Sequence, residues 1–145
     1  MDVVRLGTGD RERARWAFAV LNEVFETDGE ELSEGYLDRL LSDPRFHAWV
    51  AVDAGEVIGA LTAHELPMTR AETAELFIYD LAVRPDRQRG GVGRTLVEHL
   101  VAAADPASVS SVFVPADDED VHALDFYRAV GGAAAPVTIF TFDPA

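Results

Sequence analysis

The alternation of hydrophobic and polar residues divides the chain of 145 residues into ten short elements. Apolar residues at helical spacing (Trp16, Ala17, Val20, Leu21 and Val24) predict an amphipathic helix near the N-terminus. Short runs rich in Val, Ile, Leu and Ala predict strands instead. Helices are predicted over residues 10–25, 33–42, 91–104 and 120–130, and strands over residues 3–6, 46–53, 56–65, 74–83, 109–115 and 137–142.

This order of elements predicts a mixed α/β fold, in which a hairpin meander is followed by strands that helices connect. Asp10 and Ser33 stand at predicted helix starts, where their side chains can accept hydrogen bonds from backbone N–H groups. Ala54-Gly55 is a hairpin signal, and Gly131-Gly132 ends the last helix. Neither a repeat nor a linker interrupts the chain, so we expect a single domain over residues 1–145.

Composition narrows the classes of function. The chain holds 26 Asp and Glu against 12 basic residues, all Arg, which gives a formal charge of −14. So acidic a chain argues against nucleic acid as a partner, because phosphate contacts need basic surface. The absence of Cys excludes disulfides, thiolate metal sites and a cysteine nucleophile. There is neither an apolar run long enough for a membrane span nor a signal-peptide layout, so we expect a cytoplasmic protein without membrane contact.

The charge is distributed in blocks. Residues 23–38 carry seven acidic side chains and residues 117–125 carry five, with no basic residue in either block, whereas residues 84–94 carry four Arg and one Asp. The acidic blocks can be solvated faces that keep the protein in solution. Alternatively, they attract a cation while the Arg block attracts an anion. The sequence leaves both interpretations open.

The Arg block coincides with a glycine-rich segment, residues 83–94, between a predicted strand and a predicted helix. Glycines there let successive N–H groups converge, and the helix start adds a positive end, so a phosphate group is the expected ligand. A P-loop is excluded because the chain has no Lys. The dinucleotide pattern Gly-x-Gly-x-x-Gly fails at Leu96, which stands where the third glycine would be.

Two motifs give the chain a family resemblance. Gln88-x-x-Gly91-x-Gly93, directly after a strong strand, resembles the diphosphate loop of the GNAT N-acetyltransferase superfamily. The segment 123–131, with Phe126-Tyr127 inside it, resembles a second hallmark of that superfamily. Two positions depart from the family pattern: Asp120 stands where Asn is common, and Gly132 replaces a final Phe, which we expect to loosen the last helical turn.

The resemblance implies a GNAT fold, with a central, mostly antiparallel sheet of six to seven strands flanked by four helices. It also implies acetyl-CoA as the acetyl donor, and homodimers are common in the family. The diphosphate loop, the strand before it and one helical tyrosine would bind the donor. These residues are Leu81, Ala82, Val83, Gln88, Arg89, Gly90, Gly91, Val92, Gly93, Arg94 and Tyr127.

Shorter strings narrow the resemblance further. Residues 78–83 (Ile-Tyr-Asp-Leu-Ala-Val), together with Leu66-Pro67, Gly59-Ala60 and the Ala116-Asp117 loop, are similar to aminoglycoside 3-N-acetyltransferases of the small gentamicin-modifying type. That likeness implies a gentamicin-like antibiotic as the acetyl acceptor, and resistance to it as the consequence. Carboxylates and one tyrosine would bind its ammonium groups. The expected residues are Tyr79, Asp80, Asp117, Asp118, Asp120, Glu26 and Asp28.

Acetyl transfer to an amine needs a proton acceptor for the amine and a donor for the leaving thiolate. Tyr127 is the expected donor, and Asp80 is expected to anchor an ammonium group or to relay its proton through water. The nearest Glu on the central strand is Glu75, well upstream, so the general base stays unassigned. Without Cys or a Gly-x-Ser-x-Gly elbow, direct transfer in a ternary complex is favoured over an acyl-enzyme. Four His without metal-ligand spacing predict no metal.

The sequence leaves two other functions open. The same chemistry could act on a polyamine or a peptide amine, because the acidic blocks suit any polycation. A module that binds acyl-CoA or a drug without catalysis would use the same loop. Each residue assigned above also has a structural alternative, such as core packing for Tyr127 and helix capping for Asp120.

Overall fold

The computed structural model describes residues 1–144. The chain forms two compact units, Met1–Pro115 and a smaller one from Ala116 onward. The first holds the sheet, three α-helices and one short 3-10 helix, and the second holds the last helix.

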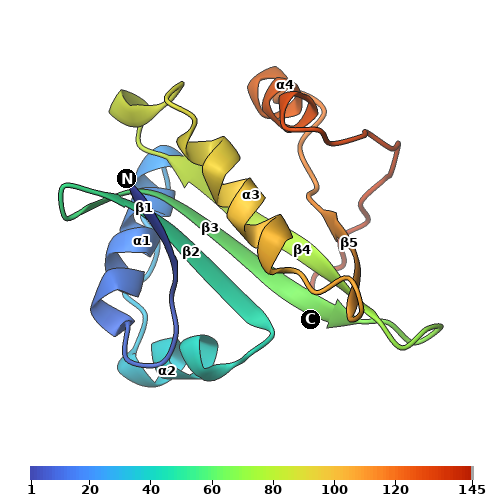
Figure 1. Ribbon diagram of the computed structural model, residues 1–145, viewed down its shortest axis with the longest axis horizontal. Coiled ribbons are helices and arrows are strands. Elements are labelled where there is room, and N and C mark those ends of the chain that lie inside the picture. The colour runs from blue at the N-terminus through green and yellow to red at the C-terminus, as the bar shows by residue number, and fades with distance from the viewer. Residues whose placement is uncertain (145) are drawn as a thin grey trace. The chain divides into compact units, whose positions relative to one another are not determined.

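A five-stranded sheet forms the centre of the first unit (Figure 1). Its strands follow each other in sequence order, β1-β2-β3-β4-β5, with antiparallel pairing except between β4 and β5, which run parallel. The mixed α/β fold and the mostly antiparallel sheet are thereby confirmed. The strands are β1 (Asp2–Arg5), β2 (Phe46–Asp53), β3 (Glu56–Pro67), β4 (Ala74–Val83) and β5 (Val109–Phe113).

Helices cover both faces of this sheet (Figure 1). Residues of α1 and α2 share one hydrophobic core with one face, and residues of α3 share a second core with the other. No helix among residues 1–144 is both long enough and apolar enough to cross a membrane. The helices are α1 (Arg11–Val24), α2 (Glu34–Ser42), the 3-10 helix η1 (Pro85–Arg87), α3 (Val92–Ala103) and α4 (Val121–Ala129).

Local sequence explains the turns and the close packing. Ala54 and Gly55 both have positive φ, 50° and 80°, as a two-residue type I′ hairpin requires. Ser33 caps α2, since its hydroxyl accepts a hydrogen bond of 3.1 Å from the Tyr36 N–H. A Cβ atom on Gly59 of β3 would lie 3.1 Å from Val92, so this glycine lets α3 pack closely on the sheet.

Three predictions about these elements are wrong. The Asp10 side chain does not cap α1, because its Oδ2 accepts a hydrogen bond of 2.7 Å from the Gly7 N–H and none from the helix. The sheet has five strands in the described residues rather than six to seven, because residues 137–142 form no strand. The β-branched and aromatic composition of that segment favours a strand, but a strand needs a backbone partner, and its apolar side chains are 71–88% exposed. The sequence also predicts that Trp16 lies on the buried face of α1, but it is 63% exposed. The buried face of α1 includes Ala14, Ala17 and Leu21.

Candidate active site

The segment that links β4 to α3 is shaped by backbone and side-chain contacts. After η1, Gln88 folds back and donates a hydrogen bond of 2.9 Å from Nε2 to the carbonyl of Val83, the last residue of β4. Arg89 and Gly91 have positive φ, 66° and 82°, so the chain turns sharply into the helix. Gly91 occupies the N-cap position of α3 in the left-handed region, which a glycine adopts without the cost that a Cβ atom brings.

This loop fits a diphosphate group. The first turn of a helix leaves backbone N–H groups without intrahelical partners, and its dipole favours negative charge. No atom would lie within 4 Å of a Cβ on Gly91, so the space beside the N-cap is open. Residues 88–93 therefore form an open turn whose amide groups suit phosphate oxygens, and those of CoA would be held here.

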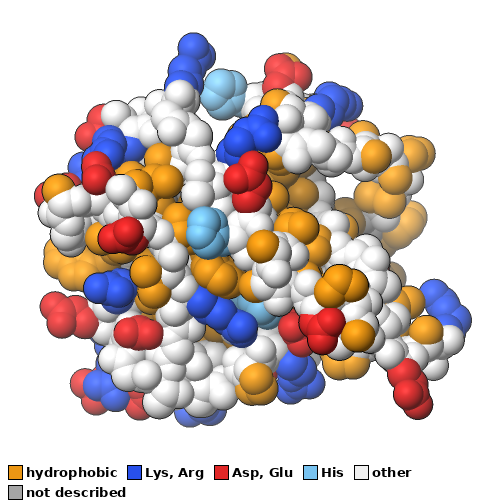
Figure 2. All heavy atoms as spheres, in the orientation of Figure 1, with side chains coloured by type: hydrophobic (Ala, Val, Ile, Leu, Met, Phe, Trp, Pro, Cys, Tyr) orange, Lys and Arg blue, Asp and Glu red, His pale blue; other side chains and the backbone are white. Residues whose placement is uncertain are grey.

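The arginines of the loop are less free than their sequence suggests. Arg84 pairs with Glu56 at 3.5 Å and with Asp86 at 3.6 Å, Arg87 pairs with Asp53, and Arg94 pairs with Glu98 at 3.8 Å. Figure 2 shows Arg and acidic side chains interspersed over one face of the molecule. Of the four arginines, Arg89 alone makes no ion pair within residues 1–144, and it is exposed.

The strand before the loop has an open edge. In the first unit β5 pairs with β4 only over Ala74–Phe77, so β4 has no strand neighbour on that side from Ile78 to Val83. This stretch contains Leu81, Ala82 and Val83, the residues expected to meet the donor through their backbone groups. Backbone N–H and C=O groups on an unpaired edge are available to a ligand.

Asp80 lies on this stretch beside an irregularity in the sheet. Thr62 pairs with Asp80 and Ala63 with Ile78, so Tyr79 is an extra residue on β4, a β-bulge that changes the direction of neighbouring side chains. The buried Thr62 hydroxyl donates a hydrogen bond of 2.9 Å to Oδ2 of the half-buried Asp80. The carboxylate is thereby held in one orientation and keeps acceptor capacity for a ligand.

Aromatic rings surround the bulge. Tyr79 is 66% exposed, and its ring contacts His64 and Phe77 edge-on, with centroid distances of 5.9 and 5.7 Å. His64 also lies against Phe46, and Phe77 against Phe113. An exposed tyrosine beside a carboxylate can bind an organic cation through both its ring face and its hydroxyl. Tyr79 and Asp80 therefore form a surface suited to an ammonium group.

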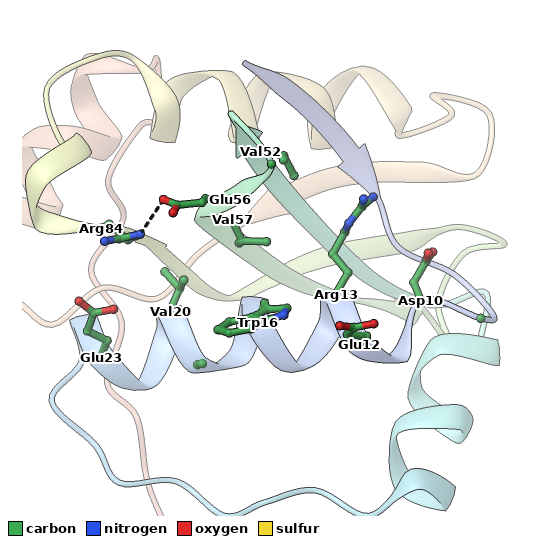
Figure 3. A pocket seen from close by; sticks show the side chains of 13 residues that line it. Asp10, Glu12, Arg13, Trp16, Val20, Glu23, Val52, Glu56, Val57 and Arg84 are labelled. Atoms are coloured by element: carbon green, nitrogen blue, oxygen red, sulfur yellow. Dashed lines mark hydrogen bonds and ion pairs between the residues drawn. The ribbon is translucent and has the colours of Figure 1, made fainter.

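A separate hollow of about 800 Å³ lies between α1 and the β2–β3 hairpin (Figure 3). Trp16 and Val20 project into it from α1 toward Val57 of β3, and the ion pair of Glu56 with Arg84 stands at one end. The exposed Trp16, which the sequence placed in the core, is thus a wall of this hollow.

Glu26 and Asp28, both expected to bind substrate, lie in the connection between α1 and α2 and are exposed. Glu26 has a φ of 55°, which is uncommon for a residue other than glycine. Within residues 1–144 neither side chain makes an ion pair. Other members of this acidic block do pair, since Arg11 of α1 contacts Asp38 at 2.9 Å and Glu34 at 3.4 Å.

The second unit contains the remaining predicted site residues. Asp120 caps α4, because its Oδ1 accepts a hydrogen bond of 3.0 Å from the Ala123 N–H. Asp117 accepts a hydrogen bond of 2.8 Å from the Glu119 N–H, and Asp118 is exposed. Asp117 and Asp120 thus stabilise their own loop and helix, which leaves some of their oxygen lone pairs for a ligand.

Tyr127 lies on α4, half-buried, with its ring 5.2 Å from that of Phe126. Burial raises the pKa of the Tyr127 phenol to about 12, and the nearby charge of Asp120 adds to the effect. The phenol therefore keeps its proton at any physiological pH and can donate it in a hydrogen bond.

Gly132 is explained by the end of α4. The Gly132 N–H donates to the Tyr127 carbonyl at 2.9 Å and the Gly131 N–H donates to that of Arg128 at 3.1 Å, which is the Schellman pattern. A Cβ atom on Gly132 would lie 2.9 Å from the Tyr127 oxygen, too close for any other residue without movement. The glycine thus tightens the last turn, where we expected it to loosen it.

Thr62, the partner of Asp80, is not among the site residues that the sequence predicts. Its signal is weak but present: a hydroxyl residue inside the otherwise apolar run of residues 58–63. Among residues 1–144 no three His, Cys, Asp or Glu side chains gather as metal ligands would.

Residues 12–131 match the acetyltransferase (GNAT) family. The [ribosomal protein bS18]-alanine N-acetyltransferase of Escherichia coli (strain K12) is 30% identical over 64 residues, which are 44% of this chain and 43% of that protein. The match thus spans less than half the length of such curated relatives, and the enzyme of Salmonella typhimurium matches to the same extent.

Solved structures resemble the chain over nearly its whole length. An aminoglycoside acetyltransferase from an uncultured soil metagenomic sample, in complex with sisomicin, is 29% identical with a TM-score of 0.93, over 99% of this chain and 96% of that one. A second soil aminoglycoside acetyltransferase is 30% identical with a TM-score of 0.93, over 99% and 98%. AAC(6')-Iy in complex with CoA, at 14% identity and a TM-score of 0.78 over 99% and 100%, shares the fold.

The family match includes the loop, the bulged strand β4 and the helix that carries Tyr127. It covers most of the chain, and the five-stranded sheet with its four helices is the fold of that family. The protein belongs to the acetyltransferase (GNAT) family.

Proposed function

We propose that the protein transfers the acetyl group of acetyl-CoA directly to an amine of an aminoglycoside antibiotic, at the 3-amino group of a gentamicin-like molecule. The consequence would be resistance to that antibiotic. The observation that carries the proposal is the position of Asp80, a carboxylate oriented by Thr62 beside the exposed Tyr79, on the same open strand edge that leads into the diphosphate loop.

The similarity to aminoglycoside acetyltransferases, one of them solved with sisomicin, supports this choice of acceptor. The 3-amino position rests on the resemblance of residues 78–83 to the gentamicin-modifying type. An aminoglycoside carries several ammonium groups, which suit a protein with a charge of −14 and two acidic blocks. Glu26, Asp28, Asp117, Asp118 and Asp120 would contact the ammonium groups that do not react.

Acetyl-CoA would supply an acetyl thioester when bound. Residues 88–93 would hold its diphosphate through backbone N–H groups, with Arg89 as the arginine available for a phosphate. The unpaired edge of β4 at Leu81, Ala82 and Val83 would orient the rest of the molecule. Holding two reactants in one geometry can account for about 7–11 kcal/mol of the barrier, so most of the acceleration would come from these contacts.

Asp80 would bind the reacting amine as ammonium and accept its proton, directly or through water, because only the neutral amine can attack. Thr62 would keep one oxygen of Asp80 occupied and direct the other toward the amine. Tyr127 would donate a hydrogen bond to the departing sulfur. Since the Tyr127 pKa of about 12 exceeds that of an ordinary thiol by about 3.5, this hydrogen bond would stabilise the thiolate without full proton transfer.

The test is the release of free CoA from acetyl-CoA in the presence of gentamicin, sisomicin or other aminoglycosides, with the acetylated nitrogen identified by NMR of the product. Activity on these antibiotics is expected, with Asp80→Asn strongly impaired and Glu75→Gln, on the same strand, close to wild type. Absence of CoA release with every aminoglycoside would overturn the proposal.

A second candidate acceptor is a peptide or polyamine amine. It is favoured by the 30% identity over 64 residues to an enzyme named for acetylating an alanine of a ribosomal protein. A peptide with an N-terminal alanine and spermidine therefore belong in the same assay. Faster CoA release with either than with any aminoglycoside would make this the function.

We also propose that the protein acts in the cytoplasm as a homodimer. Four apolar side chains near the C-terminus are exposed to water: Val137, Ile139, Phe140 and Phe142. Such exposure is unfavourable for an isolated chain and supports association with a second copy. Sedimentation equilibrium should give twice the chain mass, and a monomer at micromolar concentration would refute the dimer.

A further inference from the structure

Two ion pairs join the β2–β3 hairpin to the segment that opens the diphosphate loop. Arg87 at the end of η1 pairs with Asp53 at the end of β2. Arg84, just before η1, pairs with Glu56 at the start of β3 at 3.5 Å (Figure 3). The paired residues are 34 and 28 positions apart in the sequence, so these contacts join the loop to a segment that lies far from it along the chain.

The pair of Asp53 with Arg87 is the more protected of the two. Both of its side chains are about one-third exposed, whereas Glu56 is 71% exposed. Asp53 makes a second ion pair, 3.8 Å from its Oδ1 to the amino group of Met1. Ion pairs that share a member in a network hold their geometry better than isolated surface pairs.

Backbone contacts show what this pair holds in place. The Arg84 N–H donates to the Ile58 carbonyl at 2.9 Å, and the Arg87 N–H donates to the Arg84 carbonyl at 2.9 Å. On the other side of the turn, Gln88 holds the Val83 carbonyl. Arg87 and Gln88 are therefore the last two residues tied to the sheet before residues 89 and 90, and the position of Arg87 helps to determine where the loop begins.

We propose that Asp53 is a positioning residue for CoA binding, which holds Arg87 and thereby the diphosphate loop in its binding geometry. This inference rests on the proposed use of acetyl-CoA and adds a residue of the hairpin, outside the loop motif, to the cofactor site. Glu56 contributes in the same way through Arg84, but less, because it is more exposed.

Simple electrostatics predicts the opposite effect of Asp53 on the affinity for CoA. A carboxylate near a phosphate site should repel the ligand, so its removal alone would tighten CoA binding. If Asp53 acts by holding Arg87, its removal weakens binding, because the loop loses its geometry. The direction of the change in CoA affinity therefore separates the two effects.

The experiment measures the Kd of CoA by isothermal titration calorimetry, together with kcat, KM for acetyl-CoA and melting temperature. Asp53→Ala should raise the Kd and the KM about three- to tenfold with kcat within twofold. The charge-swapped pair Asp53→Arg with Arg87→Asp should recover most of the affinity that either single change loses. Asp2→Asn, which removes the same charge from the adjacent strand β1, is the matched control and should bind CoA like the wild type.

A Kd that is unchanged or lower in Asp53→Ala would overturn the inference. So would a charge-swapped protein that melts like the wild type but binds CoA no better than the single variants. If the unmodified chain fails to bind CoA, the proposed function itself fails, an outcome that the wild-type titration shows before any variant is made. If Asp53→Ala does not fold, the milder variant Arg87→Lys is measured in its place, and it should also raise the Kd of CoA, by a smaller factor.

Discussion

The Thr62 hydroxyl donates a hydrogen bond of 2.9 Å to the Asp80 carboxylate across the bulge between β3 and β4. Thr62 is 5% exposed, so its hydroxyl is shielded from water and depends on Asp80 as acceptor. Buried hydroxyls without a partner are costly, and hydrogen bonds to charged groups contribute about 1.5–3 kcal/mol. The pair therefore fixes the carboxylate that we propose binds the amine.

Replacing Thr62 by Val should lower kcat/KM for the amine by about 5- to 50-fold, because Asp80 loses its orientation and the buried hydroxyl is removed. Thr62→Ser keeps the hydroxyl and should retain most of the activity. The KM for acetyl-CoA should change less than twofold in both variants, as steady-state kinetics would show. Equal activity of Thr62→Val and wild type would refute a role for the pair.

Tyr127→Phe should lower kcat by about 10- to 100-fold, the contribution of one hydrogen bond to a charged sulfur. The affinity for CoA should stay within twofold, because the ring remains in place. Since the Tyr127 pKa is about 12, no alkaline decline in the rate below pH 10 should come from this phenol. An alkaline limb present in the wild type and absent from Tyr127→Phe would contradict the proposed state of the proton.

The sequence predicts this fold well where local patterns decide. All four helices and five of the six expected strands exist, since apolar periodicity and turn residues such as Ala54-Gly55 act over a few neighbours. Residues 137–142 have the same local pattern but no backbone partner in the described structure. Strand formation depends on that partner, which composition does not reveal.

The site is less predictable for the same reason. The loop motif and Asp80 are recognisable in the sequence, but Thr62 becomes the partner of Asp80 only through the register of β3 and β4. The Arg block looks like an open positive patch, yet Asp53 and Glu56 neutralise two of its members from about thirty residues away. Such pairings follow from tertiary structure, and no local sequence pattern identifies both partners.

Gly91→Ala should weaken CoA binding about fivefold or more and cost about 1–2 kcal/mol of stability, because a Cβ is unfavourable at a φ of 82°. Gly90→Ala is the matched control, since its Cβ would make an ordinary contact of 3.7 Å with the Arg87 carbonyl. Calorimetry with CoA and urea unfolding test both variants. Equal losses of CoA affinity in the two variants would show that binding does not depend on the left-handed conformation at the helix N-cap.

Asp53 should make stability depend on pH. Its hydrogen bond and ion pair with Arg87 lower the pKa of the Asp53 carboxyl from its ordinary value, so the folded state binds fewer protons than the unfolded state. The stabilisation is thus present above the unfolded pKa, about 3.9, and is lost as the pH falls through the folded pKa. The difference in melting temperature between wild type and Asp53→Asn should be largest near pH 7 and narrow in acid. A difference in melting temperature that is independent of pH would refute the contribution of the Asp53 charge to stability.

Gly132→Phe introduces the residue that the GNAT family pattern has at this position, yet it should impair this protein. A Cβ there would lie 2.9 Å from the Tyr127 carbonyl, so the Schellman turn must open or α4 must shift. The expected cost is about 1–3 kcal/mol in urea unfolding. The displaced carbonyl belongs to Tyr127, so kcat should fall as well. This loss should be seen even at a temperature where the variant is fully folded. Gly131→Asn, a residue that tolerates positive φ, should keep both the turn and the activity, and equal kcat in Gly132→Phe and wild type would show that the turn does not position Tyr127.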